Sequence, residues 1–150
     1  MLTVQTNSAN PTILVVDDSP DMRRYLRLLL ELEHYHVETA SDGMEALRRL
    51  DEGCSPALVL LDLQMPGVDG LTALRYMRQH YPQLKVIICS AEEDPETLRT
   101  VAQLGAQAHL SKPVQHLYLS AAVEQCLASE PEAITHSASV ITLPSASAEN

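Results

Sequence analysis

Short apolar runs recur along the chain, and each ends where polar or turn-forming residues begin. The run at 57–61 is apolar without a break, ends at Asp62, and is followed by Pro66, Gly67 and Gly70. An uninterrupted apolar run of this length predicts a strand covered on both faces, as in a parallel sheet. We expect further strands at 13–16, 36–40, 84–89 and 108–110.

Between these segments, apolar side chains recur every three or four residues, which predicts amphipathic helices. Helix-start signals occur at Ser19-Pro20, Ser41-Asp42, Asp69-Gly70 and Pro95. Gly53 and Gly105 stand where the second and fourth helices should stop. We therefore expect helices near 20–32, 42–52, 70–81, 95–104 and 114–128.

The regular alternation of predicted strands and helices favours an α/β fold in which right-handed crossovers build a parallel sheet. The 150 residues suit a single domain, which we place at 11–128. We expect residues 1–10 to be a flexible N-terminus. Residues 129–150 are rich in Ser, Ala, Pro and Glu apart from an apolar patch at 140–143, and we interpret them as a flexible tail or linker.

The composition narrows the possible partners and the cellular location. A formal net charge of −10 argues against direct binding of nucleic acid, because phosphate contacts need a basic surface. No apolar run is long enough to cross a bilayer, and residues 1–10 lack the features of a signal peptide. Cys54, Cys89 and Cys126 lack CxxC spacing, which indicates reduced thiols. We therefore expect a cytoplasmic protein without membrane contact.

Chemically active side chains follow the ends of four predicted strands, namely Asp17-Asp18, Asp62, Ser90 and Lys112. The carboxyl ends of parallel strands meet at one edge of a sheet, where α/β proteins bind ligands. Neighbouring carboxylates repel one another, Mg²⁺ would relieve that repulsion, and a carboxylate can act as a nucleophile toward a phosphoryl group. Lys112 and Ser90 would then bind phosphoryl oxygens.

Each of these residues also has an ordinary structural explanation. Asp18 or Ser19 could serve only as a helix cap, Ser90 could be a polar residue beside a helix, and Lys112 could be an exposed lysine at a strand end. The convergence of four strand ends on one compatible set of groups is what favours a phosphoryl-transfer site.

The same residues carry a family resemblance that covers about residues 11–128. It rests on Ile-Leu-Val-Val before Asp17-Asp18, on Leu-Leu-Asp62 before Met65-Pro66-Gly67-Val68-Asp69-Gly70, on Ser90-Ala91, and on Gly105-Ala106 before Lys112-Pro113. In this ordered set the chain resembles the receiver domain of two-component response regulators. The resemblance implies a flavodoxin-like, doubly wound, five-stranded parallel sheet in the order 2-1-3-4-5 with five helices, an order known from the chemotaxis receiver.

The resemblance also implies a phosphoacceptor and a metal site. Asp62 would take a phosphoryl group from a phosphohistidine. Asp17, Asp18 and Asp62 would hold Mg²⁺, together with the backbone carbonyl of Gln64. The chain would then be a signalling phosphoacceptor and not an enzyme, since it would catalyse only its own phosphorylation and dephosphorylation.

Further residues take roles in a switch by the same resemblance. Ser90 and Lys112 would bind the phosphoryl oxygens, and the bond between Lys112 and Pro113 would be cis. His109 stands where the family usually has Tyr or Phe, a residue that turns inward when the hydroxyl of Ser90 moves toward the phosphoryl group. A half-exposed histidine on an edge strand is the alternative interpretation of His109.

The expected output surface is formed by the fourth helix, the fifth strand and the fifth helix, including Arg99, Gln103, His109 and Tyr118. Phosphorylation would favour an active arrangement that is already populated. The implied partners are a sensor histidine kinase or a histidine phosphotransfer protein, an unidentified effector protein, and a second copy of the chain bound through the same surface. The arginines at 23, 24 and 27 are interpreted as a solvated face, with contact to a kinase as the alternative.

Other functions remain open at this point. The chain could be a receiver from a larger regulator or hybrid kinase, or a scaffold that kept the fold without phosphorylation. A phosphatase of the haloacid dehalogenase type also uses an aspartate at a strand end with Mg²⁺ and Lys. Those enzymes carry a DxD pair on the first strand, however, whereas Asp17 and Asp18 are adjacent.

Overall fold

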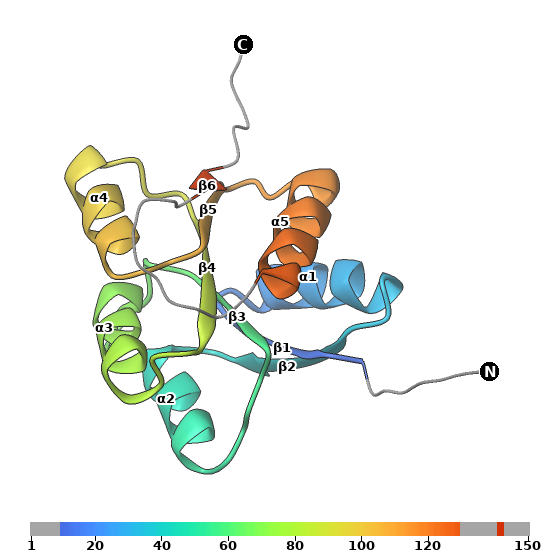
Figure 1. The fold of residues 1–150 in the computed structure, drawn as a ribbon, viewed down its shortest axis with the longest axis horizontal. Coiled ribbons are helices and arrows are strands. Elements are labelled where there is room, and N and C mark those ends of the chain that lie inside the picture. Colours follow the sequence, from blue (N-terminus) through green and yellow to red (C-terminus); the bar gives the residue numbers. More distant parts are fainter. Residues whose placement is uncertain (1–9, 130–140, 143–150) are drawn as a thin grey trace.

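Residues 10–129 and 141–142 are described by a computed structural model of the chain, in which strands and helices alternate (Figure 1). The strands are β1 (Thr12–Val16), β2 (His36–Ala40), β3 (Leu58–Leu61), β4 (Lys85–Ser90), β5 (Ala108–Ser111) and β6 (Ile141–Thr142). The helices are α1 (Pro20–Leu32), α2 (Gly43–Asp51), α3 (Gly70–His80), α4 (Pro95–Gln103) and α5 (His116–Ala128). None of the helices in these described ranges has the length and apolar character needed to cross a bilayer.

The strands form one sheet in the order β2-β1-β3-β4-β5-β6, and every neighbouring pair is parallel. The first five strands have the predicted order 2-1-3-4-5. The strand β6, which the sequence did not lead us to expect, lies beyond β5. Within the segment 129–150, interpreted above as a flexible tail or linker, the structure describes Ser129 and β6; its other residues, like residues 1–9, lie outside the described ranges.

Helices cover both faces of the sheet, with α1 and α5 on one face and α2, α3 and α4 on the other (Figure 1). Successive side chains of a strand point to opposite faces. Ile13 and Val15 therefore pack into the cluster under α1 and α5, whereas Leu14 and Val16 pack into the cluster under the other helices. Because both faces are covered, the strands can be apolar at every position, which explains the continuous runs in the sequence.

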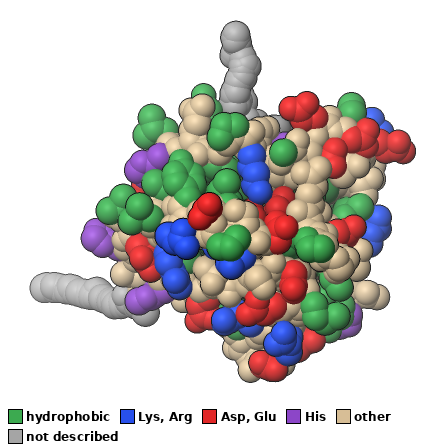
Figure 2. Space-filling model, turned by 180° about the vertical axis from the view of Figure 1, so that it is seen from behind, with side chains coloured by type: hydrophobic (Ala, Val, Ile, Leu, Met, Phe, Trp, Pro, Cys, Tyr) green, Lys and Arg blue, Asp and Glu red, His purple; other side chains and the backbone are tan. Residues whose placement is uncertain are grey.

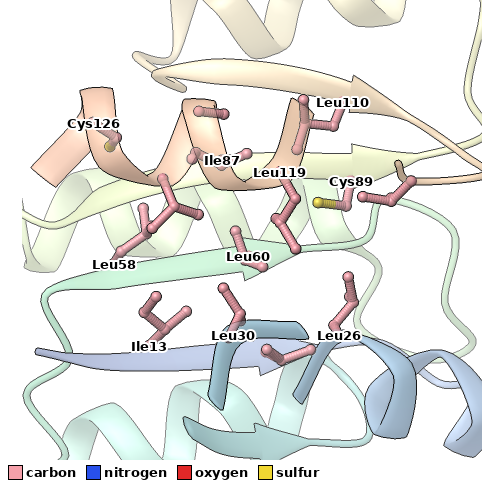
Figure 3. Packing of buried hydrophobic residues seen from close by; sticks show 14 of the residues in the cluster. Ile13, Leu26, Leu30, Leu58, Leu60, Ile87, Cys89, Leu110, Leu119 and Cys126 are labelled. Carbon is pink, nitrogen blue, oxygen red and sulfur yellow. The ribbon is translucent and has the colours of Figure 1, made fainter. Parts of the chain in front are cut away.

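The core beneath α1 and α5 consists mainly of branched aliphatic side chains, as Figure 3 shows. Leu26 and Leu30 of α1 and Leu119 of α5 point toward Ile13 and Leu60 on the strands. Complete burial of each such side chain stabilises the fold by about 1.5–3 kcal/mol relative to exposure. This packing holds α1 and α5 against the sheet and so fixes their positions relative to the strands.

Side-chain caps begin four of the helices. Ser19, Asp42, Asp69 and Asp94 accept hydrogen bonds from backbone amides in the first turns of α1, α2, α3 and α4, at 3.1, 2.8, 2.9 and 3.0 Å. The residue that caps α1 is thus Ser19 and not Asp18. The helix α5 begins at His116 and not at Val114 as predicted, and its N-cap residue Gln115 makes no side-chain capping bond.

Candidate functional site

The carboxyl ends of β1, β3, β4 and β5 lie together because these strands are parallel and in register, with Val16 beside Leu61 at the ends of β1 and β3. Backbone hydrogen bonds continue past the strand ends. The amide of Asp62 donates to the carbonyl of Val16 at 3.0 Å, and the amide of Lys112 donates to the carbonyl of Ser90 at 3.1 Å. The sheet itself therefore fixes the positions of Asp62 and Lys112.

Three carboxylates form the centre of the site. Asp17, Asp18 and Asp62 each contribute an oxygen, and these oxygens lie within 4.8 Å of one another. Asp17 and Asp62 are only 1% and 3% exposed, whereas Asp18 is exposed, so the cluster opens to solvent on the Asp18 side. A few carboxylates with one open side suit Mg²⁺, which prefers oxygen ligands and keeps several water molecules.

Lys112 places an ammonium group beside the two buried carboxylates. Its Nζ donates to Oδ2 of Asp17 at 2.8 Å and to Oδ2 of Asp62 at 3.3 Å. Burial favours the neutral amine, but the hydrogen bond to Asp17 and the negative charges of Asp62 and Asp17 outweigh it, so the pKa of Lys112 is raised. Lys112 is therefore a permanent positive charge in the site.

Asp62 is held in an environment that disfavours its ionised form. Burial raises the pKa of Asp62, and the nearby charge of Asp17 adds to the effect. The backbone amide of Gln64, which donates to Oδ1 of Asp62 at 3.2 Å, and the ammonium of Lys112 act in the opposite direction. Because the pKa of Asp62 is raised overall, a further positive charge beside this carboxylate would be electrostatically favourable.

Gly70 lets α3 start directly against the loop that follows β3. A Cβ atom at this position would overlap the backbone carbonyl oxygen of Asp62, and the amide of Gly70 donates to the carbonyl of Leu63 at 3.1 Å. Any side chain here would push the loop away from the sheet. The glycine in the Met65-to-Gly70 motif thus has a physical role, since it fixes the residues that surround Asp62.

Ser90 reaches the same edge, but its hydroxyl makes a different contact. The residue is fully buried, and its Oγ accepts a hydrogen bond from the amide of Glu92 at 3.1 Å. Within the described residues, Oγ makes no hydrogen bond to Asp62 or Lys112. A hydroxyl that accepts one bond still has its own proton to donate.

His109 lies on β5 beside Ile88 of β4 and is half-buried. Its Nε2 is buried without a hydrogen-bond partner among the described residues. Burial lowers the pKa of His109, although the backbone of Ser90 and the charge of Glu92 oppose the shift. The lowered pKa favours the neutral imidazole, which lies next to the strand that ends in Ser90.

Arg23 is a site residue that the sequence did not reveal. Its Nη1 donates to the backbone carbonyl of Asp17 at 2.6 Å, and the side chain is half-buried. The interpretation of the arginines at 23, 24 and 27 as a solvated face is therefore wrong for Arg23. Its only sequence signal is its location in the turn that follows Asp17-Asp18, a location that Arg24 shares without making the same contact.

The sequence model for the response regulator receiver domain matches residues 13–124, and the chain belongs to this family. Among its relatives, the transcriptional regulatory protein PrrA of Mycobacterium tuberculosis is 32% identical over 140 residues, which cover 93% of this chain and 60% of PrrA. The sensor kinase/phosphatase CqsS of Vibrio cholerae is 34% identical over 116 residues, which cover 75% of this chain and 17% of CqsS. The chain thus corresponds to only part of these relatives.

Solved structures agree with the predicted fold. The chemotaxis protein CheY4 of Vibrio cholerae has a TM-score of 0.74 at 28% identity, over 79% of this chain and 99% of that protein. A response regulator receiver domain from Clostridium thermocellum has a TM-score of 0.74 at 33% identity, over 78% of this chain and 94% of that protein. The flavodoxin-like fold is confirmed, and the family makes the chain a signalling phosphoacceptor domain.

Proposed function

We propose that Asp62 accepts a phosphoryl group from a phosphohistidine on a partner protein. A carboxylate oxygen of Asp62 forms a bond to phosphorus while the bond from phosphorus to the imidazole nitrogen breaks, and the leaving imidazole takes up a proton. One observation carries this assignment: Asp62 lies at a strand end, grouped with Asp17 and Asp18, with the Nζ of Lys112 only 3.3 Å from its Oδ2.

The residues that would hold Mg²⁺ are Asp17, Asp18 and Asp62, together with the backbone carbonyl of Gln64. A bound Mg²⁺ ion neutralises negative charge on the carboxylates and on the phosphoryl oxygens. Lys112 supplies the protein's own positive charge to those oxygens. Arg23 acts as a positioning residue, because its hydrogen bond to the carbonyl of Asp17 fixes the backbone that carries the metal ligand.

Phosphorylation would be sensed through Ser90 and His109. The Oγ of Ser90 can donate its proton to a phosphoryl oxygen, and a shift of the loop that carries Glu92 would follow, because that loop is bonded to the same hydroxyl. His109 lies on the neighbouring strand, and its Nε2 has no hydrogen-bond partner in the described part of the chain, so its contacts would change with the position of Ser90. Ser90 and His109 thus form the switch in this proposal.

The helix α4 is suited to respond to such a shift because little packing holds it. Among its residues only Val101 is buried, whereas α3 buries Gly70, Ala73, Leu74 and Met77. Elements with few buried apolar contacts rearrange at low free-energy cost. We infer that the output surface consists of α4, β5 and α5, with exposed or partly exposed residues Arg99, Gln103, His109 and Tyr118 available to an effector protein or to a second copy of the chain.

The phosphodonor would approach over α1 and α5. Exposed apolar side chains on these helices include Leu28, Leu32 and Leu117, at 57%, 63% and 77% exposure. Figure 2, seen from behind Figure 1, shows several hydrophobic side chains close together at the upper left, with others scattered among acidic and basic side chains over the rest of that face. This apolar face, on the second half of α1 and the first turn of α5, suits a sensor histidine kinase or a histidine phosphotransfer protein. The chain covers only 17% of CqsS, which is compatible with a receiver from a longer regulator or hybrid kinase.

The test compares Asp62→Asn with Asp21→Asn, which alters an exposed carboxylate of α1 whose side chain is 95% exposed. Both variants are incubated with acetyl phosphate and Mg²⁺, and phosphoryl uptake is measured by intact mass. The proposal predicts uptake by the wild-type protein and by Asp21→Asn, and none by Asp62→Asn. Continued uptake by Asp62→Asn refutes the assignment.

A further inference from the structure

The strand β6 is the feature of the fold that the proposed function does not use. Ile141 pairs with Ala108, and Thr142 pairs with His109, in parallel orientation. Figure 1 shows β6 against β5, between α4 and α5. Without β6, β5 would be the edge of the sheet, and an edge strand presents unpaired backbone groups that can take up another strand.

The strand β6 is not a sixth repeat of the strand–helix pattern, because the helix that precedes it lies on a different face from α3 and α4. The steps from β3 to β4 and from β4 to β5 use α3 and α4, which lie on the same face. The helix between β5 and β6 is α5, which lies on the opposite face against α1, where Tyr25 donates to the carbonyl of Val114 and Ser120 donates to Glu33.

A two-residue strand adds little to the stability of a sheet. We therefore regard β6 as a docked segment and not as part of the folding unit.

The sequence around β6 has the chemistry of a docking peptide. Val140-Ile141-Thr142-Leu143 is an apolar, mostly β-branched group within a segment that is otherwise rich in Ser, Ala and Glu. Such residues favour extended backbone and pairing with a strand. Pro144 follows directly and has no amide to donate, so it limits how far the pairing can extend.

We propose that the outer edge of β5 is a docking site for an extended segment, and that Ile141–Thr142 of the same chain occupies it in the unphosphorylated protein. The docked segment lies between α4 and α5, so it covers the edge that a partner strand or a second copy would need. Any partner that uses this edge must first displace it. The segment thus acts as an internal competitor for the surface.

A coupling to the phosphoacceptor follows if the proposed function holds. Thr142 pairs with His109, the residue assigned to the switch, so a movement of His109 alters the strand on which the segment docks. Coupling between two sites is reciprocal: if phosphorylation weakens docking, loss of docking favours phosphorylation to the same degree.

The first experiment measures amide hydrogen exchange at 108–111 in the unphosphorylated 150-residue chain, in the wild type and in Ile141→Pro. Proline removes an amide and disrupts pairing, so exchange of the β5 amides should become about tenfold faster. Ala148→Pro adds a proline outside 140–143 and should leave the exchange unchanged. Equal exchange in the wild type and in Ile141→Pro overturns the proposal.

Dilution of the wild-type protein identifies the occupant. Docking within one chain gives protection of β5 that does not depend on protein concentration. Protection that disappears on dilution means that the segment comes from a second copy, which overturns the assignment to the same chain.

The second experiment repeats the exchange measurement after acetyl phosphate and Mg²⁺, with Asp62→Asn as the unphosphorylated reference. Exchange at 141–142 should rise several-fold in the phosphorylated wild type and not in Asp62→Asn. A phosphorylated protein with unchanged exchange overturns the coupling. If Ile141→Pro exposes β5 but acetyl phosphate loads no phosphoryl group on the wild type, the docking stands and the proposed function fails.

Discussion

Lys112 donates a hydrogen bond to Asp17 at 2.8 Å, although the two residues lie 95 positions apart in the chain. The contact joins the residue that follows β5 to the residue that follows β1, across the edge where β3 ends in Asp62. In the protein without a bound cation, the ammonium of Lys112 is the positive charge that balances the two buried carboxylates. The site therefore has its anionic and cationic groups in place before any ligand binds.

Replacement of Lys112 by Met should lower the free energy of unfolding by about 1–3 kcal/mol at pH 7, because Asp17 and Asp62 lose their counter-charge. Addition of Mg²⁺ should then stabilise Lys112→Met more than the wild type, since a cation replaces the missing charge. Urea unfolding with and without Mg²⁺ measures both effects. Lys85→Met is the control, because Lys85 bonds only to backbone carbonyls near the end of α5. A Mg²⁺ response in Lys112→Met no larger than that of the wild type would contradict this electrostatic account.

The stability of the metal-free protein should depend on pH through Asp62. Burial raises its pKa above the ordinary value of 3.8, so the folded protein binds the carboxyl proton more tightly than the unfolded chain does. The stabilisation from the protonated form is complete below 3.8 and is lost as pH rises through the higher pKa of the folded state. Asp62→Asn, which stays neutral, should therefore be more stable than the wild type at pH 7 in a chelator, with a difference that shrinks as pH falls toward 3.8.

Urea unfolding from pH 4 to pH 8, about the range over which a raised carboxyl pKa acts, measures this difference. Addition of Mg²⁺ should reverse the order at pH 7, because only the wild type keeps all three carboxylates to bind the ion. A stability difference that stays constant with pH in the chelator would show that ionisation of Asp62 is not its cause.

Replacement of Gly70 by Ala should destabilise the protein and disturb the metal site together. The new Cβ would overlap the carbonyl oxygen of Asp62, and overpacking of this kind costs about 1–3 kcal/mol or more. Gly53→Ala is the matched control: Gly53 has a φ of +112° but no atom within 4 Å of an added Cβ, so its cost of about 1 kcal/mol is confined to the backbone. Thermal unfolding and Mg²⁺ titration should show weaker metal binding for Gly70→Ala alone.

Removal of the Arg23 guanidinium should clearly slow phosphoryl uptake while lowering the free energy of unfolding only slightly. Arg23→Met leaves the carbonyl of the buried Asp17 without its side-chain partner, which costs about 1 kcal/mol and loosens the backbone of the proposed metal ligand. Arg24→Met removes a guanidinium that pairs with Asp21 at the surface, where it is 73% exposed, and should change neither quantity. Uptake from acetyl phosphate at several Mg²⁺ concentrations separates the variants. Equal rates for the two would remove Arg23 from the site.

The sequence predicted those features that depend on the local order of residues, namely the buried strands and the polar residues that follow them. The continuous run before Asp62 predicted a strand buried on both faces, and the polar residues after four strands predicted a common edge. Asp17, Asp18, Asp62 and Lys112 meet there because parallel pairing leaves them no other place. The strand order itself came from the family resemblance and not from the pattern.

The features that escaped prediction depend on side-chain direction or on distant pairing. Arg23 and Arg24 are adjacent and chemically identical, and only the folded helix shows which guanidinium reaches the carbonyl of Asp17. The hydroxyl of Ser90 bonds to the amide of Glu92, a choice that residue type does not reveal. The strand β6 pairs with β5 although many residues separate the two in the chain. An apolar patch in the sequence at 140–143 does not show which strand it pairs with or in which register.

The acid beside the start of α5 comes from the end of α1. Among the described helices, only α5 begins with neither an acidic cap nor an acidic residue in its first turn, whereas α1 through α4 carry Asp or Glu at one or both positions. The carboxylate of Glu33, at the end of α1, lies against this part of α5 instead: it is 3.1 Å from Nε2 of His116 and accepts a hydrogen bond from Oγ of Ser120 at 2.8 Å. An acid near a helix N-terminus interacts favourably with the partial positive charge there. The starts of α1 through α4 carry their own acids, whereas α5 receives one from a residue 83 positions earlier in the chain, so the start of α5 depends on its packing against α1.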